Sequence, residues 1–442
     1  MRIANSVLDL PSDYRCYGID DKGDHVEAKV TRDKKRQSCP RCRKGNAAVH
    51  GHVKRSVYHV PVKSKPCILV VDLRRYRCKK CGRTFFEPLS IVSGASPHVT
   101  VDLENWIVGQ VRLCRSFAEI TRGCGASADI IQKVVDAAPL PKLHLPRHLC
   151  VDEFHAFSKR GAHEGQTKQF WTVFVDGDSG RLVDVIEGHT KEAVETWLRK
   201  FPKGERLAVK AFTCDMYDAF WRAAKAQLPN ATVCLDKFHV VALVKNAFED
   251  ARRRVNKRPG ASTAAAKRIW KLLVADRSRL CSAPRARHWQ SQEELDAKAA
   301  ERRNRALAKV ADALAGDDEN HRELRRAYLM LQLFYEWAAA DFANENECRE
   351  ALSSWISQAE GSRVSEIARA ARSIKEVKAL VVDAWMTGRT NAYAENADKK
   401  IKDVKRRSCG FTTCENMRRR LLLAFGYPPL EKGGVPLPNY ND

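Results

Sequence analysis

Apolar and polar residues alternate along much of the first 90 positions of this 442-residue chain. The alternation is clearest at 56–62 and 68–77, and a period of two predicts β-strands with one buried face. Because cysteines in closely spaced pairs accompany these strands, we expect a small β-rich domain over residues 1–92.

The pattern changes to short helical stretches over residues 95–146. Apolar residues recur on one face of 100–113, and Ser116 and Glu119 have the spacing of a capping box. Three prolines within 139–146 then favour a linker.

A further helix should begin after Ser127, beyond the break at Gly123 and Gly125. Two short helices around a glycine turn are typical of a helix-turn-helix, whose last helix enters the major groove of DNA. Gln132 and Lys133 would then contact DNA. The alternative is an ordinary helical bundle, in which the same pattern is common.

Strand and helix patterns alternate over residues 147–240. The sequence predicts strands at 149–151, 170–175, 181–186, 207–213 and 231–235, with helices at 191–201 and 217–228. Three strands followed by helix, strand, helix and strand predict an α/β domain.

Residues 241–385 change to three- and four-residue apolar steps, such as Leu324, Tyr328 and Leu331, which predict an all-helical region. A last part, 386–442, opens with a helix from Asn391 to about Arg407. We therefore expect a multidomain α+β protein of five parts, with bounds 1–92, 95–146, 147–240, 241–385 and 386–442.

The charge narrows the class of protein. Lys and Arg number 78 and Asp and Glu 54, a net charge of +24, and residues 1–90 hold 21 of the basic and 9 of the acidic residues. Such an excess favours a polyanionic partner. The sequence has no basic start followed by an apolar run and no apolar stretch of about 18 residues, so we expect a cytoplasmic protein without a membrane partner.

Two CxxC pairs, Cys39 with Cys42 and Cys78 with Cys81, have 35 residues between them. Each pair supplies two thiolates from one tight turn, and four thiolates complete the tetrahedron of a structural Zn²⁺. We expect one structural zinc. The alternative is two unrelated buried pairs.

Three aspartates stand at the ends of predicted strands: Asp152, Asp215 and Asp236. Functional groups gather at the carboxyl ends of strands in open sheets, and converging carboxylates repel one another unless a cation such as Mg²⁺ lies between them. Any one of these aspartates could instead serve a turn or a helix cap. We assign Asp152 and Asp215 as metal ligands, whereas Asp236 with His239 could orient the site.

A third acidic ligand is expected from the helix after Asn391. Glu395, Lys399, Lys402 and Arg406 fall on one face, so one acid stands above a basic stripe suited to a phosphate backbone. Residues 399–420 carry nine Lys and Arg against two acids, which favours a nucleic-acid surface. The alternative for this stretch alone is a solvated charged helix, and Glu415 is a poorer candidate for the acid.

The chain resembles bacterial insertion-sequence DDE transposases of the ISL-three family. The resemblance rests on the following stretches: Val151-Asp-Glu-Phe154, Thr213-Cys-Asp-Met-Tyr217, Leu228-Pro-Asn-Ala231, Asp236-Lys-Phe-His-Val240, Thr390-Asn-Ala-Tyr-Ala-Glu395, Ile401-Lys402 and Gly410-Phe411. It implies a zinc ribbon, a helix-turn-helix and a ribonuclease H-like core that an all-helical insertion interrupts before the last catalytic helix.

The resemblance also implies the chemistry. Asp152, Asp215 and Glu395 would form the catalytic triad with two Mg²⁺ or Mn²⁺ ions, and Asp236 and His239 match the family's accompanying signature. The protein would bind terminal inverted repeats in double-stranded DNA, cut the strands and transfer them, as at least a dimer at the bacterial nucleoid.

The sequence departs from the family pattern near the glutamate, at Asn396, Asp398 and Cys409. A catalytically silent, transposase-derived DNA-binding repressor is the alternative function. A structural zinc protein of RNA metabolism is a third, and it predicts no preference for duplex ends.

Overall fold

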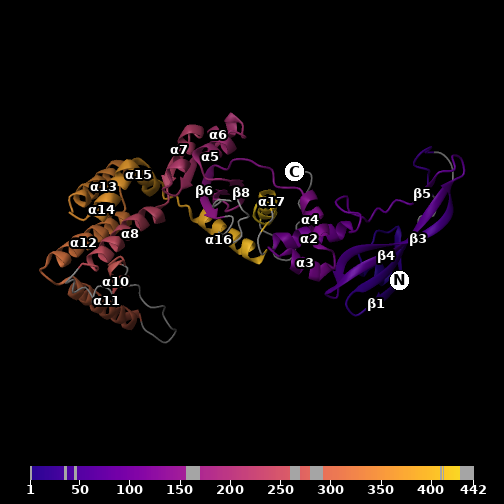
Figure 1. The fold of residues 1–442 in the computed structure, drawn as a ribbon, viewed down its shortest axis with the longest axis horizontal. Helices are drawn as coiled ribbons and strands as arrows, with labels where there is room; N and C mark the ends of the chain where they lie inside the picture. The colour runs from indigo at the N-terminus through magenta and orange to yellow at the C-terminus, as the bar shows by residue number, and fades with distance from the viewer. Residues whose placement is uncertain are drawn as a thin grey trace.

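The computed structural model describes residues 2–33, 37–43, 47–155, 170–258, 269–278, 292–408, 411 and 413–428. Its elements form an elongated molecule, with a β-rich part at one end and a helical bundle at the other (Figure 1). A second sheet lies between them, flanked by three short helices on the side of the β-rich part.

The β-rich part is a five-stranded sheet with the order β1-β2-β4-β3, and β5 pairs with β4. Its strands confirm the prediction from the alternating pattern. The elements are α1 (Arg2–Val7), β1 (Tyr14–Asp21), β2 (Val26–Arg32), β3 (Ala47–Val62), β4 (Lys65–Cys78) and β5 (Thr84–Phe86). The long antiparallel pair β3 and β4 buries Val57, Leu69 and Val71 on one face.

Three short helices follow: α2 (Val101–Arg112), α3 (Phe117–Cys124) and α4 (Ala128–Ala137). The side chains of Thr100, Ser116 and Ser127 each accept a hydrogen bond from the first turn of the helix that follows, and Ser116 with Glu119 forms the predicted capping box. Gly125 ends α3 in the left-handed region at φ 78°, which a glycine adopts without strain.

The central sheet has the strand order β10-β9-β6-β7-β8. Strands β6, β7 and β8 are antiparallel neighbours, whereas β9 and β10 run parallel to β6. The elements are β6 (His148–His155), β7 (Phe170–Asp176), β8 (Leu182–Glu187), α5 (Lys191–Leu198), α6 (Lys203–Ala208), β9 (Ala211–Cys214), α7 (Asp218–Gln227) and β10 (Thr232–Leu235).

Two predicted strands differ from the structure. The strand expected at 207–213 begins only at Ala211, because its first residues complete the short helix α6. The strand expected at 149–151 continues to His155, since residues 149–155 pair with β7 and Phe154 is buried. Asp152 therefore lies within β6 and does not follow it.

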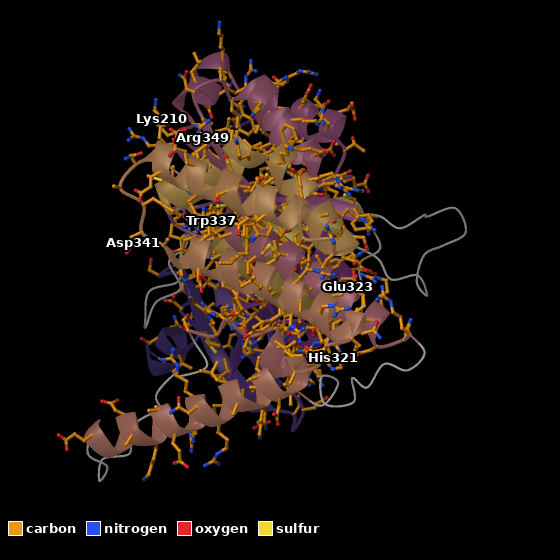
Figure 2. All side chains as sticks on the ribbon, turned by 90° about the vertical axis from the view of Figure 1, so that its left-hand side faces the viewer. Lys210, His321, Glu323, Trp337, Asp341 and Arg349 are labelled. Carbon is orange, nitrogen blue, oxygen red and sulfur yellow. The ribbon has the colours of Figure 1, made fainter. Side chains whose placement is uncertain are left out.

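The helical bundle contains α8 (Lys237–Val255), α10 (Trp270–Leu273), α11 (Gln292–Leu314), α12 (Glu319–Ala339), α13 (Glu345–Glu360), α14 (Ser365–Glu376) and α15 (Lys378–Thr387). Figure 2 looks onto this end of the molecule and shows α11 reaching out beyond the packed helices. Arg254 of α8 donates to Glu366 of α14 at 2.6 Å and so joins two of these helices.

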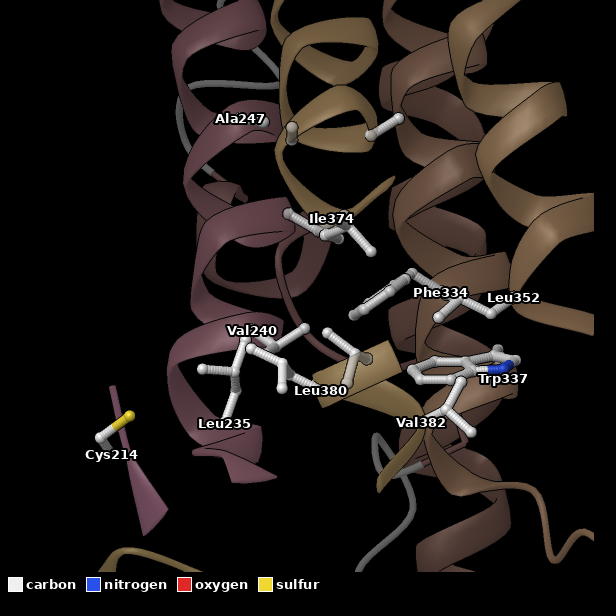
Figure 3. Packing of buried hydrophobic residues seen from close by; sticks show 14 of the residues in the cluster. Cys214, Leu235, Val240, Ala247, Phe334, Trp337, Leu352, Ile374, Leu380 and Val382 are labelled. Atoms are coloured by element: carbon white, nitrogen blue, oxygen red, sulfur yellow. The ribbon is translucent and has the colours of Figure 1, made fainter. Parts of the chain in front are cut away.

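The bundle and the central sheet share one hydrophobic core. Cys214 and Leu235 from the sheet belong to the same buried cluster as Val240 on α8 and Phe334 on α12, and Figure 3 shows this continuity. Helices α8 and α15 cross the bounds expected at 240 and 385. The bundle is therefore an extension of the sheet's core rather than a body with a separate core.

The last two helices, α16 (Ala392–Arg407) and α17 (Cys414–Phe425), cover the face of β6, β7 and β8. On α17, Arg418 pairs with the buried Asp184 of β8 at 2.7 Å, Arg419 donates to the carbonyl of Val135 at 2.8 Å, and Arg420 donates to that of Arg115 at 2.9 Å. These three arginines, expected on a nucleic-acid surface, instead hold the three-helix part against the sheet. Among the helices described, none has the length and apolarity to cross a membrane.

Candidate active site and metal centre

The four cysteines of the two CxxC pairs converge at one end of β4. The sulfur of Cys39 lies 3.6 Å from that of Cys81, and the sulfur of Cys42 lies 3.7 Å from that of Cys78. Sulfurs about 2.3 Å from a tetrahedral zinc are separated by about 3.8 Å, so the geometry fits Zn²⁺. A backbone N–H of Cys42 helps to lower the pKa of the Cys39 thiol to about 6, whereas burial and the three neighbouring thiols raise that of Cys81 to about 11. The cluster therefore supports one structural zinc.

Three aspartates occupy the same level of three adjacent parallel strands in the central sheet. Cys150 pairs with Thr213, and Leu235 pairs with Cys214, so continuing each register places Asp152 and Asp236 on either side of Asp215. Residues at one level of a parallel sheet project from the same face. The sheet therefore places the three aspartates on one face, although only Asp215 and Asp236 follow the end of a strand. Among the described residues, the acidic group whose ligand atoms all lie within 4.8 Å of one another is Asp236, His239 and Glu395, and it includes neither Asp152 nor Asp215.

Glu395 approaches this centre from α16, one turn after the start of the helix. Its carboxylate lies within 4.8 Å of the ligand atoms of both Asp236 and His239, a group compact enough to hold one metal ion. The Nδ1 atom of His239 lies 2.9 Å from a carboxylate oxygen of Asp236. Asp236 therefore lies close enough to Glu395 to share a metal ion with it, in addition to its hydrogen bond with His239.

The electrostatics reflect the crowding of these acids. Burial raises the pKa of Asp152 to about 7, and the charge of Asp215 adds to the shift. Burial likewise raises the pKa values of Asp215 and Glu395. The hydrogen bond to Asp236 raises the pKa of His239, so a protonated imidazole is favoured among the carboxylates. Burial alone would raise the pKa of Asp236, but the hydrogen bond and charge of His239, together with the backbone N–H groups of Asn391 and Phe238, lower it.

Asp152 should therefore destabilise the metal-free protein at neutral pH. The folded chain keeps the proton up to about pH 7, whereas an unfolded aspartate loses it near pH 4, so stability falls as the pH rises between these values. We expect Asp152→Asn to increase the free energy of unfolding of the metal-free protein at pH 8 by about 2–4 kcal/mol, and so to raise its melting temperature by several degrees. The gain should vanish near pH 4. Calorimetry at both pH values measures it, and an equal gain at both would contradict the assignment.

From the sequence, Asn391 is expected only to begin the last helix, and the structure gives it a further role. Its side chain is fully buried and donates to the carbonyl of Val151 at 3.0 Å, and its backbone N–H points to Asp236 at 3.4 Å. The hydroxyl of Thr213 donates to its side-chain oxygen at 3.5 Å. The side-chain amide of Asn391 therefore ties α16 to β6 and β9, and its backbone N–H adds Asp236 after β10. An asparagine one helical turn before the predicted catalytic glutamate could have indicated this role.

Replacing Asn391 should displace Glu395 without removing any acid. In Asn391→Ala the carbonyl of Val151 loses its donor, a cost of about 1–3 kcal/mol. We expect DNA nicking to slow by about 10- to 100-fold, with a melting temperature a few degrees lower. Asn391→Ser, which keeps a polar group, should lose less activity than Asn391→Asp, which adds a charge beside Asp236. Equal rates in all variants would show that the amide does not position the helix.

The predicted DNA-contacting residues lie on exposed or half-buried helix surfaces. Lys399, Lys402 and Arg406 are exposed on α16, where Lys402 pairs with Asp398 at 2.5 Å and Arg406 with Asp403 at 2.7 Å. On α4, Lys133 is exposed, and half-buried Gln132 donates to Asp136 at 2.7 Å. These pairs are local and would have to open for a phosphate or a base. Cys409 and Gly410, noted in the sequence, lie outside the described residues.

Comparison with known proteins gives two family matches. A model of the ISL-three DDE type, described as "Transposase", matches residues 149–421, and one described as "zinc-finger of transposase IS204/IS1001/IS1096/IS1165" matches residues 35–81. The first covers the sheet, the bundle and both final helices. The second covers all four cysteines of the zinc cluster.

Individual relatives agree with these matches. The transposase for insertion sequence element IS1001 of Bordetella parapertussis is 25% identical over 400 residues, which cover 88% of each chain. The transposase for insertion sequence element IS1557 of Mycobacterium tuberculosis is 26% identical over 279 residues. That match covers 59% of this chain and 58% of the relative, so the chain spans little more than half of that protein's length.

Proposed function

Because the chain belongs to the ISL-three family of insertion-sequence DDE transposases, we propose that it binds terminal inverted repeats in DNA, cuts the strands and joins them to target DNA. The observation that carries the proposal is the set of three aspartates at one level of adjacent strands, one of which, Asp236, lies close to Glu395 on α16. The two family matches, over residues 149–421 and 35–81, support it.

The fold supports the same function. A five-stranded sheet with three antiparallel strands followed by two parallel ones, and with helices between the last strands, fits a ribonuclease H-like core. The capped helices α3 and α4 around Gly125 fit a helix-turn-helix beside the zinc ribbon. We infer that these two parts bind the element ends, with Gln132 and Lys133 toward the DNA.

The residues of the site have distinct parts in this proposal. Asp152, Asp215 and Glu395 would hold two divalent ions, Mg²⁺ or Mn²⁺, which activate the attacking oxygen and stabilise the leaving oxygen in phosphoryl transfer when bound. The donor type fits, since all three are half-buried and offer carboxylate oxygens, the ligands that Mg²⁺ takes in proteins. Asp236 fixes the ring of His239, and Lys399, Lys402 and Arg406 would contact phosphates. Two element ends require at least two copies of the chain.

The test uses supercoiled plasmid that carries the DNA bracketing the gene. The purified chain with Mn²⁺ or Mg²⁺ should nick this plasmid at the ends of inverted repeats and leave a plasmid without them intact. A chain that binds these repeats but cleaves under no metal condition would be the silent repressor. A chain with no preference for duplex ends would match the third alternative, a zinc protein of RNA metabolism.

A further inference from the structure

Phe238 is exposed at the edge of the acidic centre. Its side chain is 66% exposed, more than any other large apolar side chain in the described part of the chain. It stands in the first turn of α8, between Asp236 and the buried Val240. An exposed phenylalanine forgoes the free energy of burial. Exposure alone is ordinary for a single residue, but this ring also contacts His239 of the group that contains Asp236 and Glu395.

The neighbours of Phe238 have partners, whereas Phe238 packs into none of the buried clusters. Lys237 lies over the ring of Trp385, with 5.1 Å from its Nζ atom to the ring centroid, and His239 faces Asp236. The ring of Phe238 meets that of His239 edge to face, with centroids 5.6 Å apart and planes at 90°. In the first turn of α8, the half-buried Lys237 and His239 therefore have partners within the protein, whereas the ring of Phe238 remains exposed.

We propose that Phe238 stacks on the base of a nucleotide next to the phosphate that is cut; this inference rests on the proposed function. The ring of Phe238 contacts that of His239, whose ligand atom lies within 4.8 Å of those of Asp236 and Glu395, so the nucleotide next to a phosphate bound at this group would lie within reach of Phe238. Every base has a π-face, so an aromatic ring can hold an unstacked base regardless of its identity. Phe238 would fix the reacting strand by its base, while the basic residues of α16 hold it by phosphates.

The inference predicts that an aromatic side chain is required at this position. Stacking on one base corresponds to about a 5- to 150-fold effect, so Phe238→Ala should slow plasmid nicking within that range. Phe238→Trp should stay within a few-fold of wild type, and Phe238→Leu should resemble Phe238→Ala. Because the side chain packs in no core, the melting temperatures should agree within about a degree. Trp270→Ala is the matched control, since Trp270 is 41% exposed and lies on α10 in the bundle.

A second measurement identifies the base. Once the plasmid assay has mapped the cut, duplexes that carry a single abasic nucleotide at each position around it are cleaved by wild type and by Phe238→Ala. At one adjacent position the abasic nucleotide should slow wild type as much as the variant is slowed, and the two changes together should cost no more than either alone.

The outcomes separate the two proposals. A wild-type chain that cuts no DNA overturns the proposed function. If wild type cuts and Phe238→Ala cuts equally fast, or Phe238→Leu matches wild type, stacking by Phe238 is wrong while the transposase assignment stands. If Phe238→Ala instead changes the mass of the protein in solution, and every abasic duplex loses the same activity with both proteins, the ring serves contact between copies and the inference is overturned.

Discussion

Asp152→Asn is expected to reduce DNA cleavage by at least about 10³-fold, because a metal ligand among crowded carboxylates contributes several kcal/mol to the transition state. Asp215→Asn and Glu395→Gln should have effects of the same size. Each substitution keeps the shape of the side chain and removes its charge, so the packing of β6, β9 and α16 should be unchanged. Binding to the inverted repeats should therefore remain within a few-fold of wild type.

The measurement is the rate of plasmid nicking, with DNA binding followed in parallel by gel shift. Glu415→Gln is the matched control, because Glu415 is an acid on the neighbouring helix α17 that pairs with Arg418 at 3.6 Å. Full cleavage by Glu395→Gln together with loss in Asp236→Asn would transfer the third ligand to Asp236. That result would agree with the short distances among Asp236, His239 and Glu395 but would contradict the proposed triad.

Removal of zinc is expected to unfold the cysteine-bearing end of the first sheet and to weaken DNA binding by at least tenfold. Structural zinc contributes about 10–16 kcal/mol to the folding of small zinc domains, far more than β3 and β4 could recover from their few buried contacts near the cysteines. We expect one zinc per chain. Cys39→Ser and Cys78→Ser should release it, and proteolysis should then cut first within residues 37–86.

The control separates a metal ligand from an ordinary thiol. Cys114 is half-buried outside the zinc cluster, and Cys114→Ser should retain the zinc and bind DNA normally. A zinc-selective chelator should reproduce the Cys39→Ser result while leaving the melting of the central sheet unchanged. A metal-free chain with the same protease resistance and DNA affinity as the zinc-loaded chain would contradict a structural role.

Local signals in the sequence predicted the elements well because they act over one turn. The caps at Thr100, Ser116 and Ser127 and the spacing of the CxxC pairs each involve residues a few positions apart. The error at 207–213 has the opposite origin. Its apolar residues suit a strand, yet only Ala211–Cys214 finds neighbours in β6 and β10, and that pairing depends on residues far away.

The site was harder to predict for the same reason. The three aspartates could be named from their places near strands, but their common level depends on register, which no single strand specifies. Asn391 shows the limit most clearly. Its contacts join residues separated by 155 to 240 positions, so its burial and its three partners follow only from the folded chain.

The late position of α16 and α17 in the chain has a consequence during synthesis. Cys150, Trp171 and Val173 of the central sheet are buried against Ala394, Ile401 and Leu421, which leave the ribosome more than 200 residues later. Until then α16 and α17 cannot cover this apolar face, so the nascent chain is prone to aggregate unless a chaperone binds it. We therefore expect a chain that is truncated after the bundle to aggregate or to be degraded. It should not persist as an inhibitor that competes with the full-length protein.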